Sequence, residues 1–414
     1  MKNFKLLEIN LRMFDTQVTT QESLSPEMKT FYDKNLIRLA KPELVHDQFG
    51  QKKPIPKNGG KTIEFRKFSP LGKATTPLVE GVTPKGNSLD TTAITATVQQ
   101  YGDYITVSDV ISLTTIDNTL VETQALLSAQ AGATLDTVTR EIINAGTNVQ
   151  YGESAVDARY LLEGGKENDN NYLTVDCIKR AVRALKKNNA KKIDGSYVAI
   201  IHPDITYDIT SDPLWENVKT YCDPKDMYNG EIGRLHGVRF VETNEAKIFH
   251  AEDLTAENRN LTVKSFAGNV VTVGEAITEA EATALAGRSV IIGSELFTIT
   301  EAKSGGAGSA TITLKETPVA DAPAQGDVVY PGEGGAQGRD VYSTLVLGSN
   351  AYGVTEIEGG GLESITKPLG SAGTADPLNQ RASSGWKAIK TAEILVDEYM
   401  VRIETASTFE SGAN

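Results

Sequence analysis

Two stretches near the start of the chain alternate apolar and polar side chains with the period of two that is typical of β-strands. They are residues 61–68 and 93–107. The segment between them, residues 69–92, holds a proline or glycine at six positions. Loops longer than about 15 residues are uncommon inside compact domains. The pattern therefore predicts two paired strands that carry a long projecting hairpin, which is unstable alone and needs a partner surface.

A helical period follows the hairpin. Apolar residues recur at steps of three, four and seven between residues 117 and 148, which predicts a helix far longer than the usual 11 or so residues. Asp117 is the expected N-cap and Gly146 the expected stop. A shorter helix is predicted at residues 28–39, because Pro26 suits a first helical turn. That helix belongs either to a domain core or to an arm that packs on a neighbouring subunit.

A second amphipathic segment, residues 174–207, predicts a helix followed by a short buried strand at 197–202. The polar face of this helix is strongly basic. The candidates for contact with nucleic acid on this face are Lys179, Arg183, Lys186 and Lys187. A charged helix face is more often simply solvated, so both interpretations stay open.

Residues 250–338 differ from their surroundings, because short apolar segments alternate there with glycine-rich turns. Strands are expected at 261–266, 270–273, 290–292, 296–300, 310–314 and 327–330. A short helix is expected at 278–286, where Thr278 and Glu281 have the spacing of a capping box. The segment holds 12 acidic and 5 basic residues, a net charge of −7. This pattern predicts an inserted small β domain that faces solvent, after which further strands are expected at 341–355 and 386–405.

Composition narrows the class of protein. The chain has 414 residues and a net charge of −13, which argues against a protein that coats nucleic acid along its whole surface. Only two cysteines are present, so a disulfide framework is not expected. The N-terminus lacks the apolar core of a secretory signal, and no apolar run is long enough to span a membrane. We expect a protein that is intracellular when made.

Chemical motifs give no support for an enzyme. The four histidines and two cysteines of the sequence do not have metal-ligand spacing, and no nucleophile elbow or phosphate loop occurs. Asp204, Asp208 and Asp212 step by four and could hold a hydrated cation, although a solvated face is the favoured interpretation. We therefore predict no catalytic residue, no cofactor and no metal site.

Three stretches give the sequence a specific resemblance. They are TPKGNSLDTTAITATVQQYGDYITVSDV (83–110), NGEIGRLHGVRFVETNEA (229–246) and DPLNQRASSGWKAIKTAEILVDEYMVRIE (376–404). Together with the order of the predicted elements, they resemble the major capsid proteins of tailed phages with the Hong Kong 97 fold, in the N-four-type branch. The implied class is α+β, with an N-terminal arm, an extended loop, a spine helix, and peripheral and axial domains. The inserted β domain departs from that common pattern.

The resemblance implies a division of the chain. The chain is expected to begin with an N-terminal arm (1–58), the extended loop with peripheral strands (59–108) and the spine helix with the peripheral domain (109–171). The axial domain is expected in two parts (172–249 and 339–385), which the inserted acidic β domain (250–338) separates. C-terminal strands (386–414) complete the chain. The late strands are expected to join the hairpin strands in the peripheral domain.

The resemblance also implies a function. The family consists of structural proteins that form pentamers and hexamers and close an icosahedral shell around double-stranded DNA. Expected partners are other copies of the chain, packaged DNA on the inner face, and portal, scaffold or decoration proteins; no membrane is expected. The virion is the expected location, after assembly in the host cytoplasm. Lys73, Lys85 and Gly81 of the extended loop are the expected positions of contact between subunits, without a predicted covalent cross-link.

Two other classes stay open on the sequence alone. A cellular nanocompartment shell protein has the same fold but packages enzymes. A surface-binding protein would use the inserted domain at 250–338 to recognise a carbohydrate or a receptor.

Overall fold

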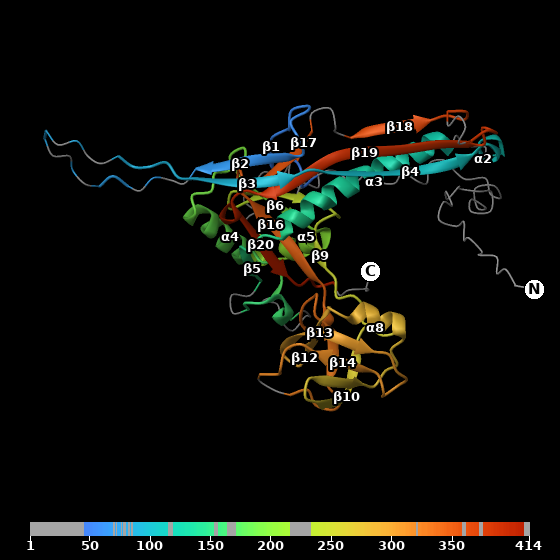
Figure 1. Ribbon diagram of the computed structural model, residues 1–414. Helices are drawn as coiled ribbons and strands as arrows, with labels where there is room; N and C mark the ends of the chain where they lie inside the picture. Colours follow the sequence, from blue (N-terminus) through green and yellow to red (C-terminus); the bar gives the residue numbers. More distant parts are fainter. Residues whose placement is uncertain are drawn as a thin grey trace, which may run out of the picture.

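The computed structural model describes residues 45–114 except for nine positions between 69 and 85, then 119–152, 156–163, 171–215, 233–319, 322–357, 362–371 and 376–409. Figure 1 shows a long layer from which a hairpin projects, an αβ part beneath that layer, and a small barrel below the αβ part. The α+β class is confirmed. The predicted helix at 28–39 and the N-cap Asp117 lie outside the described residues. Among the described helices, none has the length and apolar character needed to cross a bilayer.

The long layer is a five-stranded sheet built around one strand, β19 (Arg381–Ile394). The strand β4 (Gln99–Ser108) pairs with β19 over ten residues, while β17 (Tyr352–Glu356) and β18 (Glu363–Lys367) pair with successive parts of its other edge. The short strand β1 (Gln51–Lys52) pairs with β17 in parallel. One strand thus connects the whole length of the layer.

The spine helix α3 (Thr119–Asn144) lies along β19, and the shorter helix α2 (Asp109–Thr114) precedes it. A small apolar cluster joins α3 to the sheet; it consists of Leu127, Ala131, Leu135, Trp386 and Ala388. The predicted stop lies two residues beyond the helix. Gly146 is buried, and a Cβ there would lie 2.4 Å from Met400 and 2.6 Å from Asp397, so a larger residue would require these two side chains to move.

The projecting hairpin consists of β2 (Thr62–Phe68) and β3 (Thr91–Thr97), which pair in antiparallel register. The single strand expected at 93–107 is wrong, because the chain breaks its pairing at Val98: β3 pairs with β2, whereas β4 pairs with β19. Alternation of apolar residues continues through such a change of partner, so the pattern alone does not reveal it.

A seven-stranded sheet forms the αβ part. Its order is β5-β20-β16-β6-β8-β7, and β9 also pairs with β16. The strands are β5 (Val149–Tyr151), β6 (Tyr197–Ile201), β7 (Arg234–Leu235), β8 (Val238–Glu242), β9 (Ile248–Phe249), β16 (Val341–Leu347) and β20 (Met400–Thr405). Helices α4 (Val175–Lys187) and α5 (Pro203–Thr210) pack on it, and Ile178, Leu185 and Ile205 are fully buried there. Single turns of 3₁₀ helix occur at Arg159–Leu161, Ala336–Gly338 and Asp397–Tyr399.

The late strands are distributed differently from the expectation. The last strand, β20, lies inside the seven-stranded sheet between β5 and β16 rather than in the peripheral layer. Conversely, β17 and β18 belong to the long layer although they fall within the range expected to be axial. The physical reason is that these partners are far apart in the sequence, and the alternation within a strand does not specify which sheet it joins.

The inserted segment forms a closed barrel of six strands with its own core. The strands are β10 (Leu261–Ala267), β11 (Val270–Val273), β12 (Ser289–Ile292), β13 (Glu295–Lys303), β14 (Thr311–Leu314) and β15 (Val328–Pro331). Each coincides with a predicted strand to within a few residues. Helix α8 (Glu279–Leu285) begins with the expected capping box of Thr278 and Glu281. Because the barrel is closed, its sheet has no unpaired edge. An open sheet of the same short strands would have unpaired edges.

The two chain segments that connect the barrel to the αβ part are tied together at one place. Asp340 accepts a hydrogen bond from the Ala251 backbone N–H at 3.0 Å, and its other oxygen lies 2.9 Å from His250 Nδ1. The barrel therefore leaves and rejoins the αβ part at adjacent points.

We expect residues 251–340 to fold when expressed alone, because the barrel closes its own sheet and core. Leu285→Ala, which empties a fully buried position, should lower the free energy of unfolding by about 2–5 kcal/mol. The exposed control Lys303→Ala should change it by no more than about 0.5 kcal/mol. Urea denaturation followed by circular dichroism measures both; an isolated segment without a cooperative transition would contradict the expectation.

Candidate assembly surfaces and the polar joint that holds them

The hairpin of β2 and β3 presents apolar side chains to solvent. Phe68, Leu71 and Leu89 are 58%, 62% and 67% exposed. A two-stranded ribbon has no third layer to cover such side chains, so another surface must bury them if they are to contribute to stability. This hairpin is the first candidate for contact with another chain.

The expected contact residues of the hairpin are exposed where they can be described. The side chain of Lys73 lies on the surface, and Gly81 adopts a φ of +77°, a conformation that favours glycine. Lys85 lies outside the described residues. The structure thus places Lys73 and Gly81 on the projecting element, and their role in subunit contact stays a prediction.

The base of the hairpin is fixed to the long layer by close packing. The Phe65 ring lies so close to Gly353 of β17 that a Cβ there would be 2.8 Å from it. From the end of β1, the Lys53 ammonium group lies 5.5 Å from the centre of the Phe65 ring and donates to the Glu64 carbonyl at 3.3 Å. The hairpin therefore projects in a defined direction.

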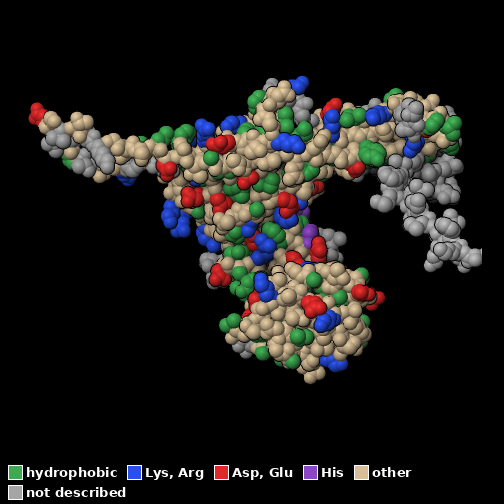
Figure 2. All heavy atoms as spheres, viewed as in Figure 1, with side chains coloured by type: hydrophobic (Ala, Val, Ile, Leu, Met, Phe, Trp, Pro, Cys, Tyr) green, Lys and Arg blue, Asp and Glu red, His purple; other side chains and the backbone are tan. Residues whose placement is uncertain are grey.

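The opposite end of the long layer also exposes apolar side chains. Tyr104, Val110 and Leu378 are each at least half exposed there. Figure 2 shows green side chains at this end of the layer, far from the hairpin. The two ends of one long molecule thus carry exposed apolar groups, as expected for a subunit that contacts copies on more than one side.

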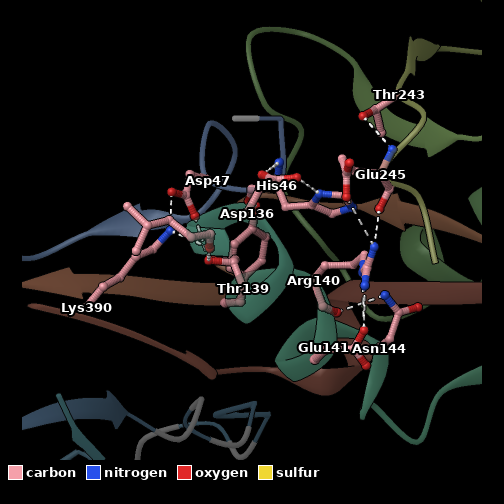
Figure 3. Close-up of polar contacts among 12 residues, drawn as sticks. His46, Asp47, Asp136, Thr139, Arg140, Glu141, Asn144, Thr243, Glu245 and Lys390 are labelled. Atoms are coloured by element: carbon pink, nitrogen blue, oxygen red, sulfur yellow. Dashed lines mark hydrogen bonds and ion pairs between the residues drawn. The ribbon is translucent and has the colours of Figure 1, made fainter. Parts of the chain in front are cut away.

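A buried group of polar residues connects these parts, and we call it the polar joint: His46, Asp47, Asp136, Thr139 and Lys390 (Figure 3). His46 donates its backbone N–H to Asp136 at 2.8 Å, and its Nδ1 lies 2.6 Å from the other Asp136 oxygen. Both residues are fully buried. This pair fastens the first described turn of the chain to the spine helix.

Lys390 connects the same turn to the central strand. Its ammonium group contacts the Asp47 carboxylate and donates to the Leu135 carbonyl at 3.0 Å, while Thr139 donates to Asp47 at 2.6 Å. Lys390 is 6% exposed. Because a buried charge without a partner is strongly unfavourable, the turn at 46–47, the helix α3 and the strand β19 must keep this arrangement together.

Tyr352 completes the joint from β17. Its hydroxyl donates to the His46 carbonyl, and burial raises the pKa of Tyr352, with the nearby Asp47 and Asp136 carboxylates acting in the same direction. The phenol therefore stays protonated and keeps its role as a donor.

A more exposed group links α3 to the αβ part. Arg140 donates to the Glu245 carbonyl at 2.9 Å, and Lys247 lies 2.8 Å from Glu141 (Figure 3 shows Arg140, Glu141 and Glu245). Burial alone would raise the pKa of Glu141, but hydrogen bonds from Lys247 and Arg140 outweigh it and hold the pKa below its ordinary value. Near the end of α3, Asn144 accepts a hydrogen bond from Ser343 of β16 at 2.6 Å.

Sequence reasoning missed the polar joint entirely. His46 and Asp136 are 90 residues apart, and Asp47 and Lys390 are 343 apart. The one local signal was Lys390, which takes the place of an apolar residue in the alternation of 386–394. A lysine at such a position is equally compatible with a strand residue that faces solvent.

The four basic residues predicted on α4 share one exposed face. Lys179, Arg183, Lys186 and Lys187 point away from the buried stripe of Ile178, Val182 and Leu185. Three of them line a shallow pocket of about 300 Å³ together with Val182 and with His236 from the β7–β8 turn. Partial burial lowers the pKa of His236, and Lys179 and Lys186 lower it further.

The three aspartates considered as ligands of a cation accept hydrogen bonds from different parts of the protein instead. Asp204 accepts from the Tyr342 hydroxyl, Asp208 from Thr408, and Asp212 from the backbone of Val175 and Leu214. Within the described residues, no group of three or more potential ligands is placed to hold a metal ion.

With the geometry described, the chain can be compared with known proteins. Residues 166–316 match the model of the phage capsid protein family. The Cyanophage Pam1 capsid structure is 13% identical with a TM-score of 0.54, and the match covers 95% of this chain and 100% of that one. The chain has the fold of phage capsid proteins. This agrees with the Hong Kong 97-type resemblance of the sequence.

Other solved structures give the same result for the capsid fold. The capsid of Ralstonia phage GP4 is 12% identical with a TM-score of 0.53, covering 92% of this chain and 95% of that chain. The capsid of Cyanophage P-SCSP1u is also 12% identical, with a TM-score of 0.52 and coverage of 98% and 100%. No curated protein sequence matches the chain. The projecting hairpin and the spine helix are therefore parts of a capsid fold.

Lys390→Met should lower the free energy of unfolding by about 3 kcal/mol, because Asp47, whose side chain is 18% exposed, keeps a largely desolvated charge without its cation. The double variant Lys390→Met/Asp47→Leu should lose less than the sum of the two single variants. The control is Lys387→Met on the same strand, whose half-exposed pair with Glu363 contributes no more than about 1 kcal/mol. Urea denaturation of the unassembled protein followed by tryptophan fluorescence checks this; equal stability of the Lys390 and Lys387 variants would refute it.

The contact of α3 with the αβ part should weaken in acid. The folded pKa of Glu141 is lower than its ordinary value of 4.5, so its contribution is present above that value and is lost as the pH falls through the folded pKa. Since Glu141 is partly exposed, the effect should be below about 1 kcal/mol. Glu141→Gln should remove this part of the pH dependence in unfolding measurements at pH 3–7, and an unchanged profile would contradict the assignment.

Proposed function

We propose that the chain is the major capsid protein of a tailed phage and that it assembles into a closed icosahedral shell around a double-stranded DNA genome. The capsid fold and the family match support the capsid role. The observation that carries the assembly proposal is the hairpin of β2 and β3, which exposes apolar side chains and projects far from the rest of the chain (Figure 1).

The shell forms when each hairpin lies on a neighbouring copy. A stable interface commonly buries more than about 1,200 Å² in total, and a thin ribbon provides a large area for few residues. Pentamers and hexamers are the repeating units of the proposed shell, and Lys73, Lys85 and Gly81 are the positions proposed for contact between neighbours. The polar joint keeps the hairpin and the opposite apolar end at a fixed separation, so that each copy meets its neighbours in the same way.

The barrel is proposed to lie on the outer surface. Its net charge of −7 is unfavourable close to packaged phosphates. The segments that connect it meet the αβ part near Asp340, and the Ala336 N–H donates to the Leu162 carbonyl at 2.9 Å, so the barrel projects without disturbing the two sheets. Portal, scaffold or decoration proteins are further partners of such a shell, with assembly in the host cytoplasm and residence in the virion.

We expect the purified chain to form capsomers or closed shells, visible by electron microscopy and sedimentation. The triple variant Phe68→Ser/Leu71→Ser/Leu89→Ser should prevent shell closure while leaving the circular dichroism spectrum unchanged, because it removes only exposed apolar groups of the hairpin. The matched control Val270→Ser/Leu296→Ser/Val319→Ser changes three exposed apolar residues of the barrel and should leave shells intact.

Two outcomes would overturn the proposal. A wild-type chain that stays monomeric at high concentration would contradict self-assembly. Shells that form normally from the hairpin variant would remove the hairpin from the mechanism. Shells isolated from infected cells should contain DNA, whereas packaged enzymes would instead identify a nanocompartment.

A further inference from the structure

A concentrated basic surface occurs where α4 meets the β7–β8 turn, and it extends beyond the residues that the sequence singled out. We call it the basic surface; it consists of Lys179, Arg183, Lys186, Lys187, Lys192 and His236. Figure 2 shows blue side chains gathered at the edge of the αβ part where Figure 1 places α4. Lys192 belongs to it because its ammonium group lies 3.6 Å from the position of a Cβ on Gly237, directly beside His236.

Among the residues that the structure describes, the cations of the basic surface have no counterions. In the part of the chain that the structure describes, Lys179, Arg183, Lys186, Lys187 and Lys192 form no ion pair with a carboxylate. Arg180 of the same helix behaves differently, because it turns inward, pairs with Asp176 at 3.4 Å and donates to the Tyr151 carbonyl at 3.2 Å. The inward-facing cation is thus paired, whereas the outward-facing ones have no anionic partner within the described part of the chain.

Their arrangement is linear and slightly concave. Lys179 and Lys186 are seven residues apart on one helix face, which corresponds to about 10 Å along its axis, and Arg183 lies between them. His236 closes one side of the pocket that Lys179, Arg183 and Lys186 line. A straight row of point charges beside a shallow hollow fits a regular polyanion, because duplex DNA carries one charge per about 1.7 Å of its axis.

We propose that the basic surface binds the phosphate backbone of duplex nucleic acid, an inference that rests on the proposed capsid function. Lysines and arginines on the helix contact successive phosphates, and His236 of the turn sits at the side of the groove. Binding through phosphates is independent of sequence and weakens as salt concentration rises.

The acidic barrel of another copy is the competing occupant. Seven of its 12 carboxylates accept hydrogen bonds or form ion pairs within the barrel region. These are Glu275, Glu281, Glu295, Glu301, Glu316, Asp327 and Glu333. Because these contacts hold the carboxylates at separate loops and strand ends, a duplex, whose charges are evenly spaced, is the better match for a continuous row of cations.

The test uses the full-length, unassembled protein and a fluorescent 24-base-pair duplex. Lys179→Gln/Lys186→Gln should weaken binding at least tenfold at low salt and reduce the slope of log affinity against log salt by about 2, since each phosphate contact contributes about 0.9. The matched control Lys303→Gln/Lys315→Gln removes the same charge from the exposed surface of the barrel and should leave both quantities unchanged.

Equal effects of the two double variants, or no duplex binding by the wild type, would overturn the proposal. A Lys179→Gln/Lys186→Gln protein that binds duplex normally but sediments as a smaller species would also overturn it, in favour of contact with another copy. Electron microscopy of the same variant distinguishes failure of the basic-surface proposal from failure of the proposed capsid function. Normal shells with unaltered duplex binding refute the basic surface alone, whereas a wild-type chain that forms no shells refutes the capsid function itself.

Discussion

The buried contact between Lys390 and Asp47 is the constraint on which the long layer depends. A thin sheet covered by one helix has only small apolar clusters, such as the group around Leu127 and Trp386. Small clusters favour contact but specify geometry weakly, since apolar packing is not directional. A buried ammonium group is directional and unfavourable when unpaired. By requiring Asp47, Thr139 and the Leu135 carbonyl around it, Lys390 fixes the turn at 46–47, the spine helix and β19 in one arrangement.

This constraint explains how an extended molecule keeps its shape before it meets a partner. The hairpin and the opposite apolar end are far apart, and each exposes groups that only another chain can cover. If the layer between them bent freely, the exposed groups would contact neighbouring copies in many different arrangements, and the assembly would not be regular. Rigid internal contacts thus make exposed apolar ends compatible with ordered association in a capsid fold, while the αβ part is joined through a more exposed set of ion pairs around Arg140 and Lys247.

Much of the fold was predictable from local patterns, and the exceptions share one cause. The six barrel strands, the spine helix and the capping box of Thr278 all depend on neighbours within a few residues, which the sequence displays. The break at Val98 and the placement of β20 depend on partner strands elsewhere in the chain, and the local sequence pattern does not reveal these partners. Of the candidate surfaces, the four basic residues of α4 were predicted by their helical spacing. His236 was not, because it reaches the same surface from the β7–β8 turn.

Asp340 has a further consequence through its position at the base of the barrel. It holds the entering and leaving segments side by side, so the barrel joins the rest of the chain in much the same way as a surface loop. Evolution could exchange such a module without altering either sheet, and a foreign domain with adjacent termini could replace it in the same way. The site where the insertion begins is thus a natural position for displaying peptides or enzymes in many regularly spaced copies.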